Sequence, residues 1–364
     1  MKLPRILFLY IGKHFLLSIL VALFGLLALT LLIDLVELIR RTAGRDQVTI
    51  GVIMQMTLLK LPSIAGKLLP YAVLIGSMLA LTRLTRSQEL VVTRASGVSV
   101  WQFLAPAVVV AMLLGLFMVM AVNPIASVLL LRYEQMEGKY FTGKSSFSAI
   151  SHSGLWLRQI EDKGEHIIHA QRISQSDMSF RNLVIFRYDA QGKFNERMDV
   201  KHAELQADML RLNEVLRTIP GQPPEAVTHM SIPTSLTLTY IQDSFASPET
   251  LSFWYLPSFI NMLEEAGFSA LRHKLHLNSL LASPFLLAGT VLIAAIFSLR
   301  LPRRGKIGLM AVAGIVTGFL LHFFTDIIHA LGSAGTVPVM MAAWAPAAMV
   351  MMAGAATLLH LEDG

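Results

Sequence analysis

The chain has 364 residues, of which 54% are hydrophobic and only 15% are charged. A soluble domain carries about 25% charged residues, so this composition excludes an ordinary soluble enzyme. Cysteine is absent, which excludes disulfide bonds, a cysteine nucleophile and a metal site built on cysteine.

The formal net charge of +6 is unevenly distributed along the chain. Residues 132–274 contain 15 Lys and Arg against 17 Asp and Glu, whereas the rest of the chain contains 15 against 7. The basic part also contains the long apolar runs. We therefore interpret the excess positive charge as membrane topology and lipid contact rather than nucleic-acid binding.

Six apolar segments are predicted to span a membrane, which takes about 20 mostly apolar residues each. Three precede and three follow a long polar stretch in the middle of the chain. The second is the shortest, and it extends back through Leu58–Ala65. The six are His14–Ile33, Leu68–Leu81, Ala105–Val122, Leu277–Leu299, Gly308–Ile328 and Val337–Leu359.

The short loops predict the orientation, because Lys and Arg gather on the cytoplasmic side. Ten basic residues lie on one side and five on the other. We therefore expect both termini in the cytoplasm and the middle domain outside. The ten are Lys2, Arg5, Lys13, Arg83, Arg86, Arg94, Arg300, Arg303, Arg304 and Lys306, and the five are Arg40, Arg41, Arg45, Lys60 and Lys67.

The polar middle of the chain is predicted to be an all-β domain. Apolar and polar residues alternate in Ser235–Tyr240 and in much of Leu183–Tyr188, a period typical of strands. Asp189–Gly192 is predicted as a hairpin turn. About seven or eight short strands indicate a sandwich or jelly roll. Besides Val184–Tyr188 and Phe194–Val200, which flank the turn, the expected strands include Leu155–Ile160, Ile167–Ile173, Ala203–Ala207 and Leu210–Leu216, with a loop at Pro220–Pro224 and a helix at Leu256–Ala266.

These segments define the expected domains. Membrane helices are expected in residues 1–131, with a cytoplasmic helix at 83–97. A jellyroll-like β-domain is expected at 132–250, a connecting helix at 251–274 and the last three membrane helices at 275–364. The fold class is therefore a six-helix membrane protein, arranged 3+3, with an inserted all-β domain.

The segment between the second and third spans is predicted to be a short helix, with Ser87 as its N-cap and Gly97 just after its end. Leu90, Val91 and Val92 are expected to be exposed on it, between Glu89 and Arg94. Exposed apolar residues flanked by charges favour a docking surface for a soluble motor. The alternative is a surface helix that only links two spans.

The same segment resembles a known family. Gln88–Gly97, Leu69–Gly76 and Gly154–Trp156 are similar to signatures of the lipopolysaccharide-export permeases LptF and LptG. Tyr10–Lys13 and Ile33–Glu37 favour the LptG branch. The resemblance covers essentially the whole chain and implies a transport subunit of the bacterial inner membrane with a periplasmic jellyroll.

The resemblance also implies partners. They are an LptF-like permease, a dimer of an LptB-like cytoplasmic ATPase, an LptC-like bitopic protein and an LptA-like periplasmic bridge. ATP would be bound by the ATPase, so no cofactor is expected on this chain. Glu89 would sit in a groove of the ATPase, with Arg86, Leu90, Arg94 and Gly97 as the other coupling residues.

Five basic residues near the outer ends of the first three spans are candidate ligands for lipopolysaccharide phosphates: Arg40, Arg41, Lys60, Lys67 and Arg132. Such residues form charge-assisted hydrogen bonds with phosphate. The alternative is that they extend towards lipid headgroups, as Lys and Arg at helix ends commonly do. Asp34 stands where the family often has a basic residue, so either the substrate head differs or Asp34 and Glu37 pair with Arg41 or a partner chain.

Several patterns suggest chemistry that we do not expect. Gly138–Ser145 matches the P-loop pattern, but a polar, helix-like segment precedes it instead of a buried strand. His166 and His169 fall on a strand, where they would face opposite sides, and His273 and His276 adjoin Arg272 and Lys274. We therefore expect no nucleotide site and no metal.

His322 and Asp326 lie one turn apart in the fifth predicted span, with His329 further on. Ionisable residues inside a span usually face the bundle interior. We interpret them as a mutually satisfied pair or as residues lining a substrate cavity. Three alternatives stay open: a lipoprotein-releasing or mechanotransmitting ABC permease, an intramembrane enzyme that uses His322 and Asp326, and a purely structural scaffold.

Overall fold

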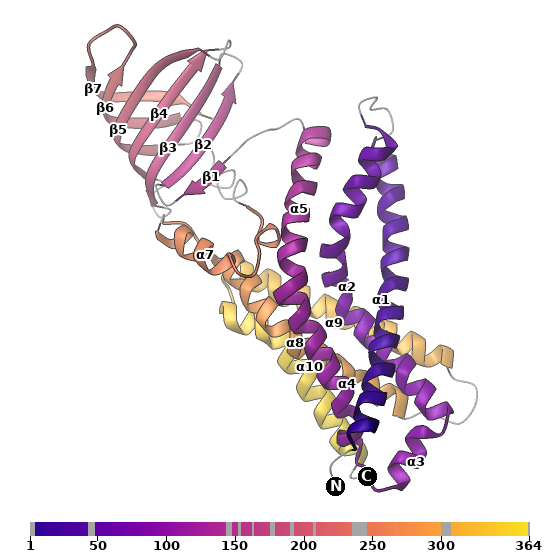
Figure 1. Cartoon of the computed structure of the whole chain (residues 1–364). Coiled ribbons are helices and arrows are strands. Elements are labelled where there is room, and N and C mark those ends of the chain that lie inside the picture. The colour runs from indigo at the N-terminus through magenta and orange to yellow at the C-terminus, as the bar shows by residue number, and fades with distance from the viewer. Residues whose placement is uncertain are drawn as a thin grey trace. The chain divides into compact units, whose positions relative to one another are not determined.

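The computed structural model, shown in Figure 1, contains a helical unit and a β unit. The first comprises residues 1–136, 252–254 and 271–364, and the second comprises residues 137–251 and 255–270. The described residues are 4–42, 48–142, 148–151, 154–161, 164–174, 179–189, 193–206, 209–234, 246–265, 267–299 and 307–362.

Within the described residues, six helices are long and apolar enough to cross a membrane, which confirms the predicted helical membrane fold. The third is one continuous rod in which a π-helical segment separates two α-helices. The spans are α1 (Arg5–Thr42), α2 (Ile50–Arg86), the rod of α4 (Val100–Phe117), η1 (Met118–Val122) and α5 (Asn123–Glu137), then α8 (Leu271–Leu299), α9 (Ile307–Ser333) and α10 (Val339–Glu362).

The helices differ in how much of their apolar surface the chain itself covers. In α2 and α8, 56% of the most apolar stretch of the helix is buried, because α1, α4 and α10 pack around these two helices. In α1 and α9 only 11% is buried. These two helices therefore present most of their apolar surface to lipid or to another membrane protein.

The start of α1 and the end of α10 lie at the same end of the helical unit as α3 (Glu89–Ala95), as Figure 1 shows. The ends of α1 and α2 that the connection at residues 43–49 joins lie at the opposite end. The last turn of α1 is closed by Thr42, whose hydroxyl donates to the carbonyls of Leu38 and Ile39 at 2.9 and 3.0 Å.

The π-helical segment η1 carries a specific contact with the chain that returns from the β unit. The indole N–H of Trp254 donates to the carbonyl of Met120 at 3.2 Å, and the N–H of Phe253 donates to Asn123 Oδ1 at 2.7 Å. A π-helical segment changes the local hydrogen-bond pattern of a helix and is frequently found at functional sites.

In its described residues, the β unit contains one seven-stranded antiparallel sheet in which each strand pairs with its neighbours in sequence. The prediction of an inserted all-β domain is confirmed. A jelly roll adds connections that cross between two sheets, whereas the described strands follow one another as a meander. The strands are β1 (Ser148–Ser151), β2 (Gly154–Glu161), β3 (Gly164–Ser174), β4 (Ser179–Asp189), β5 (Phe194–Gln206), β6 (Met209–Thr218) and β7 (Glu225–Pro233).

Most predicted strands match this sheet, including the β4–β5 pair beside the predicted hairpin. Ala203–Ala207 is wrong as a separate strand, because β5 continues without a break to Gln206. The predicted strand Ser235–Tyr240 lies outside the described residues. The predicted helix at Leu256–Ala266 is α7 (Leu256–Glu265), and a short 3-10 turn, η3 (Pro248–Thr250), precedes it.

A polar network crosses the middle strands of the sheet. Glu196 of β5 is buried, and its two carboxylate oxygens accept bonds from Arg187 of β4, at 2.8 Å, and from Arg217 of β6. Arg187 also donates to His166 of β3 at 3.0 Å. Both oxygens of the buried carboxylate are therefore bound, as buried polar groups usually are. Together these side-chain bonds join the four strands β3, β4, β5 and β6.

Candidate functional site

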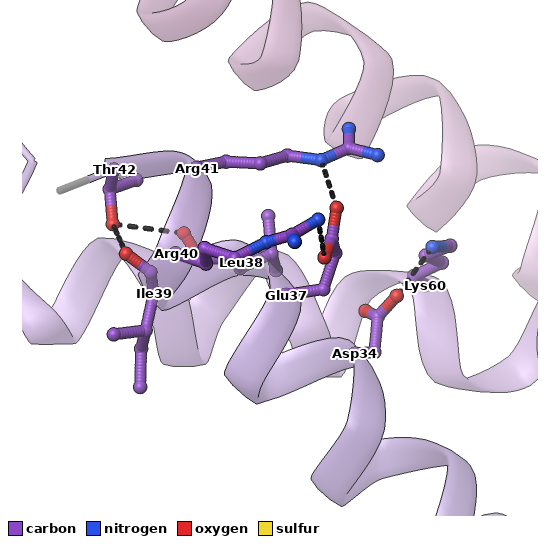
Figure 2. A network of polar contacts seen from close by, with 8 residues as sticks. All are labelled: Asp34, Glu37, Leu38, Ile39, Arg40, Arg41, Thr42 and Lys60. Atoms are coloured by element: carbon purple, nitrogen blue, oxygen red, sulfur yellow. Dashed lines mark hydrogen bonds and ion pairs between the residues drawn. The ribbon is translucent and has the colours of Figure 1, made fainter.

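The end of α1 carries the first part of the basic cluster drawn in Figure 2. Arg40 and Arg41 lie in the last turn of α1, and both reach back to Glu37. Arg40 Nη2 is 2.8 Å from Glu37 Oε2, and Arg41 Nε is 2.8 Å from Glu37 Oε1. The two guanidinium groups stay largely exposed, with 77% and 53% of their side chains accessible. They can therefore reach a ligand while Glu37 orients them.

Lys60 of α2 provides the second part of the cluster. Its Nζ lies 2.7 Å from Asp34 Oδ1, so the ion pair joins α1 to α2. The same ammonium lies 5.5 Å from the centre of the Tyr133 ring of α5, a cation–π distance. Asp34 Oδ2 is buried and has no hydrogen-bond partner within the described part of the chain.

The structure thus brings three of the five predicted phosphate ligands into one cluster with two acids. We define the mouth cluster as Asp34, Glu37, Arg40, Arg41 and Lys60. Of the alternatives left open for the two acids, pairing with Arg41 is observed for Glu37, whereas Asp34 pairs with Lys60 and not with Arg41. The helix register set by the α1–α2 packing produces this pair.

The other two candidates lie further along their helices. Lys67 is exposed on α2, about two turns beyond Lys60. Arg132 is exposed on α5 and directly precedes Tyr133, the residue that sequence reasoning missed. The cation–π contact explains why an aromatic residue stands there. Phosphate binding by all five basic residues stays a prediction.

The predicted coupling helix is shorter than expected. Residues 83–86 belong to α2, and α3 runs from Glu89 to Ala95. Ser87 is therefore wrong as an N-cap: it ends α2, and its hydroxyl donates to the Arg83 carbonyl at 3.1 Å. Gln88 makes the sharp turn instead, with a φ of 64°.

The end of α3 agrees with the prediction that Gly97 follows the helix. Gly97 has a φ of +85°, a conformation that glycine adopts at no steric cost after a helix end. Arg86, Arg94 and Gly97 are exposed, and Glu89 is half-buried. The side chain of Tyr10, near the start of α1, interacts with the Glu89 carboxylate.

The apolar residues of α3 do not all face outwards. Leu90 is only 6% exposed and belongs to the core cluster that contains Leu84 and Phe103, so its assignment to an exposed surface is wrong. Val91 and Val92 are 52% and 67% exposed. One side of α3 therefore anchors the helix to the bundle, and the other presents valines beside Arg94.

Of the two interpretations of the ionisable residues in the fifth span, the mutual pair is seen in the structure. His322 Nε2 lies 3.2 Å from Asp326 Oδ2 on α9, and the ring of Tyr71 from α2 contacts that of His322 edge to face. His329, one turn beyond Asp326, is 3.2 Å from the hydroxyl of Ser279. The pair is more than half exposed, which suits a polar cavity or a partner surface better than hydrocarbon.

The P-loop-like pattern and the paired histidines are the remaining motifs. Gly138–Thr142 forms η2, a helical continuation of α5, so the start of the P-loop-like pattern does not follow a strand; its end lies outside the described residues. His166 is buried in β3, whereas His169 stacks on Trp156 on the other face. Among the described residues, no three His, Cys, Asp or Glu side chains gather as a metal site.

Comparison with known proteins gives a consistent result. A family model described as "Lipopolysaccharide export system permease LptF/LptG" matches residues 9–360. The permease protein LptG of Escherichia coli (strain K12) is 26% identical over 364 residues, covering 93% of this chain and 94% of that protein. LptG of Haemophilus influenzae is 24% identical over 355 residues, covering 94% of this chain and 95% of that protein.

Proposed function

The chain belongs to the LptF/LptG family of lipopolysaccharide export permeases, and we propose that it is the LptG-type half of an ATP-driven lipopolysaccharide extractor. The observation that carries the proposal is the family match over residues 9–360, which includes the spans, α3 and the β unit. The relatives are permeases, so the chain is a transport subunit and not an enzyme. This sets aside the intramembrane enzyme and the lipoprotein-releasing or mechanotransmitting permease.

The chain is a multi-pass protein of the inner membrane. The proposed orientation places both termini and α3 in the cytoplasm and the β unit in the periplasm. Ten basic residues in the short loops on one side against five on the other support it. An LptF-like permease would then cover the outward apolar surfaces of α1 and α9, of which only 11% is buried.

The proposed mechanism uses the two ends of the helical unit. The lipid would enter from the outer leaflet with its phosphates at the mouth cluster and near Lys67 and Arg132. An LptB-like ATPase dimer would bind ATP and press on α3 through Glu89, Arg94 and the exposed valines. Closure would move the lipid into the β unit, and an LptC-like protein and an LptA-like bridge would receive it.

Mass spectrometry of the proteins that co-purify with the tagged chain in mild detergent tests this proposal. We expect a second six-span permease, a P-loop ATPase and a bitopic periplasmic β-protein. Recovery of LptF as the second permease would support the LptG assignment. Recovery of the chain alone, under conditions that preserve other ABC complexes, would contradict the ATPase-coupled mechanism.

A further inference from the structure

We propose that Asp34 makes the mouth cluster selective for phosphate groups that carry their own cation. Such a group is either a phosphate substituted with an amine or a phosphate bound to a divalent metal ion. The inference rests on the proposed function, because it concerns which headgroup the site takes. It starts from the charge of the cluster, in which two acids oppose three bases (Figure 2).

The Arg half of the cluster is open to a bare phosphate. Arg40 and Arg41 share Glu37 at an exposed position, with 77%, 53% and 35% of the three side chains accessible. Exposed ion pairs contribute little free energy, so a phosphate can take either guanidinium from Glu37 at small cost. The arginines therefore attract phosphate without discriminating between bare and cation-bearing groups.

The Lys60–Asp34 half differs from the Arg half because its side chains are largely shielded from solvent. The side chain of Asp34 is only 15% exposed and that of Lys60 32%. Asp34 Oδ1 binds Lys60, and Asp34 Oδ2 is buried without a partner among the described residues. If a phosphate drew Lys60 away, Oδ1 would lose its partner as well, and neither oxygen of Asp34 would be bound. An unpaired carboxylate in such a poorly solvated place is strongly unfavourable.

A phosphate with its own cation avoids this cost by exchanging partners. Lys60 moves from Asp34 to the phosphate, and the cation moves from the phosphate to Asp34. Two ion pairs exist before the exchange and two after it, and no charge is left unpaired. The ring of Tyr133, whose centre is 5.5 Å from the ammonium, also stabilises the charge of Lys60.

Lipid binding to the permease complex in nanodiscs tests the inference. Two lipopolysaccharides are compared, one with unsubstituted phosphates and one with ethanolamine on its phosphates, each in EDTA and in Mg²⁺. In EDTA we expect the ethanolamine form to bind about tenfold more tightly, as expected for one buried charge left unpaired. If Mg²⁺ brings the unsubstituted form to the same affinity, a bridging metal ion can also supply the cation.

Asp34→Asn should abolish the preference, because the unsubstituted lipid then leaves no carboxylate unpaired. Glu37→Gln is the matched control: it removes one negative charge from the same cluster but keeps the Lys60–Asp34 pair. It should strengthen binding of both lipids together and retain the preference. If Asp34→Asn fails to assemble, the double variant Asp34→Asn/Lys60→Gln, which leaves no buried charge, should also show no preference.

Equal affinities of the unmodified chain for the two lipids in EDTA would overturn the inference, and this comparison depends on no variant. The binding itself would then still support the proposed lipid site. A preference that persists in Asp34→Asn would likewise overturn it. Failure of both lipids to bind an intact complex would overturn the inference and the proposed lipid site together.

Discussion

Gly76 of α2 lies directly against the backbone of Ile19 in α1. A Cβ placed on Gly76 would come within 2.5 Å of the Ile19 Cα and 2.7 Å of its nitrogen. The two helix backbones therefore touch at this point, and only glycine leaves room for the contact. The glycine that ends the motif Leu69–Gly76 is thus explained by the packing of α1, a helix that otherwise buries little of its apolar surface.

Gly76→Ala is expected to force α1 away from α2 and to destabilise the chain. Overpacking costs about 1–3 kcal/mol, and here the obstacle is backbone, which cannot rotate away. Thermal unfolding of the full chain in detergent measures the effect. Gly25→Ala in α1 is the control, because a Cβ there has nothing within 4 Å. An unfolding midpoint for Gly76→Ala as high as that of Gly25→Ala would contradict the packing argument.

Reversing the charge of Arg40 and Arg41 is expected to weaken lipopolysaccharide binding without affecting complex assembly. Arg40→Glu/Arg41→Glu would add two carboxylates beside Glu37 and repel phosphate, and both side chains are exposed enough to be replaced without repacking. We expect a loss of about tenfold or more, since charge-assisted hydrogen bonds are the stronger class.

The measurement is lipid binding to the purified complex, with assembly followed by co-purification. Lys193→Glu/Arg211→Glu is the matched control, because it changes the net charge equally at exposed positions of the β unit. Normal lipid binding by the Arg40/Arg41 variant would refute the role of the mouth cluster in binding phosphate.

Two residues of α3, Leu90 and Val92, are expected to give opposite phenotypes. Val92 is 67% exposed, so Val92→Asp should weaken ATPase association about tenfold and leave the stability of the chain unchanged. Leu90 is 6% exposed, so Leu90→Ala should cost about 2–5 kcal/mol of stability. Co-purification of the ATPase and thermal unfolding of the chain separate the two effects.

Glu89→Ala should also lower ATPase association and leave lipid binding to the permease intact. Arg181→Ala, an exposed change in the β unit, is its control. If the ATPase associated normally with both Glu89→Ala and Val92→Asp, α3 would not be the docking surface.

The sequence predicts the parts of the fold that depend on composition and period. Long apolar runs predict the spans, and alternation predicts strands such as β4, because each is a property of one segment. The Asp34–Lys60 pair joins residues 26 positions apart and depends on how α1 packs on α2. No pattern within either helix determines that packing.

The errors at α3 have a similar cause. Ser87 has the right residue type for an N-cap, but α2 continues to Arg86, so Ser87 ends one helix instead of starting the next. Leu90 stands among exposed valines in the sequence and is buried because the bundle core meets α3 on that side. Which side of a short helix is covered follows from its neighbours, and seven residues contain too little periodicity to indicate it.

Glu196→Gln is expected to loosen the middle strands of the β unit. The change keeps the shape of the side chain but removes the charge that Arg187 and Arg217 share. Breaking a buried ion pair is costly, and the two arginines are 29% and 33% exposed, so water reduces the loss to about 1–3 kcal/mol.

Hydrogen–deuterium exchange of the β4–β6 amides in the full chain measures this change, and we expect exchange at least about fivefold faster. Glu214→Gln is the matched control, because Glu214 pairs with Lys201 on the surface, with 57% and 70% of the side chains exposed. The ion pair with Lys201 lowers the pKa of Glu214, but surface pairs contribute little to stability. Equal exchange in the two variants would contradict a stabilising role of the buried network.

Trp254→Phe is expected to release the contact between the returning chain and η1. The variant keeps an aromatic ring but removes the N–H that binds the Met120 carbonyl, a loss of about 0.5–1.5 kcal/mol. Asn123→Ala removes the acceptor of the Phe253 N–H and should have the same local effect. Both changes act on the point where the rod of the third span departs from regular α-helix.

The measurement is amide exchange in Met118–Asn123, which should become several-fold faster in both variants. Trp156→Phe makes the same side-chain change on β2 and should leave this exchange unchanged. If Trp254→Phe left it unchanged as well, while Asn123→Ala increased it, the backbone bond of Phe253 alone would hold the segment. If neither variant changed it, η1 would be maintained by packing within the rod, and the contact with the returning chain would have no stabilising role there.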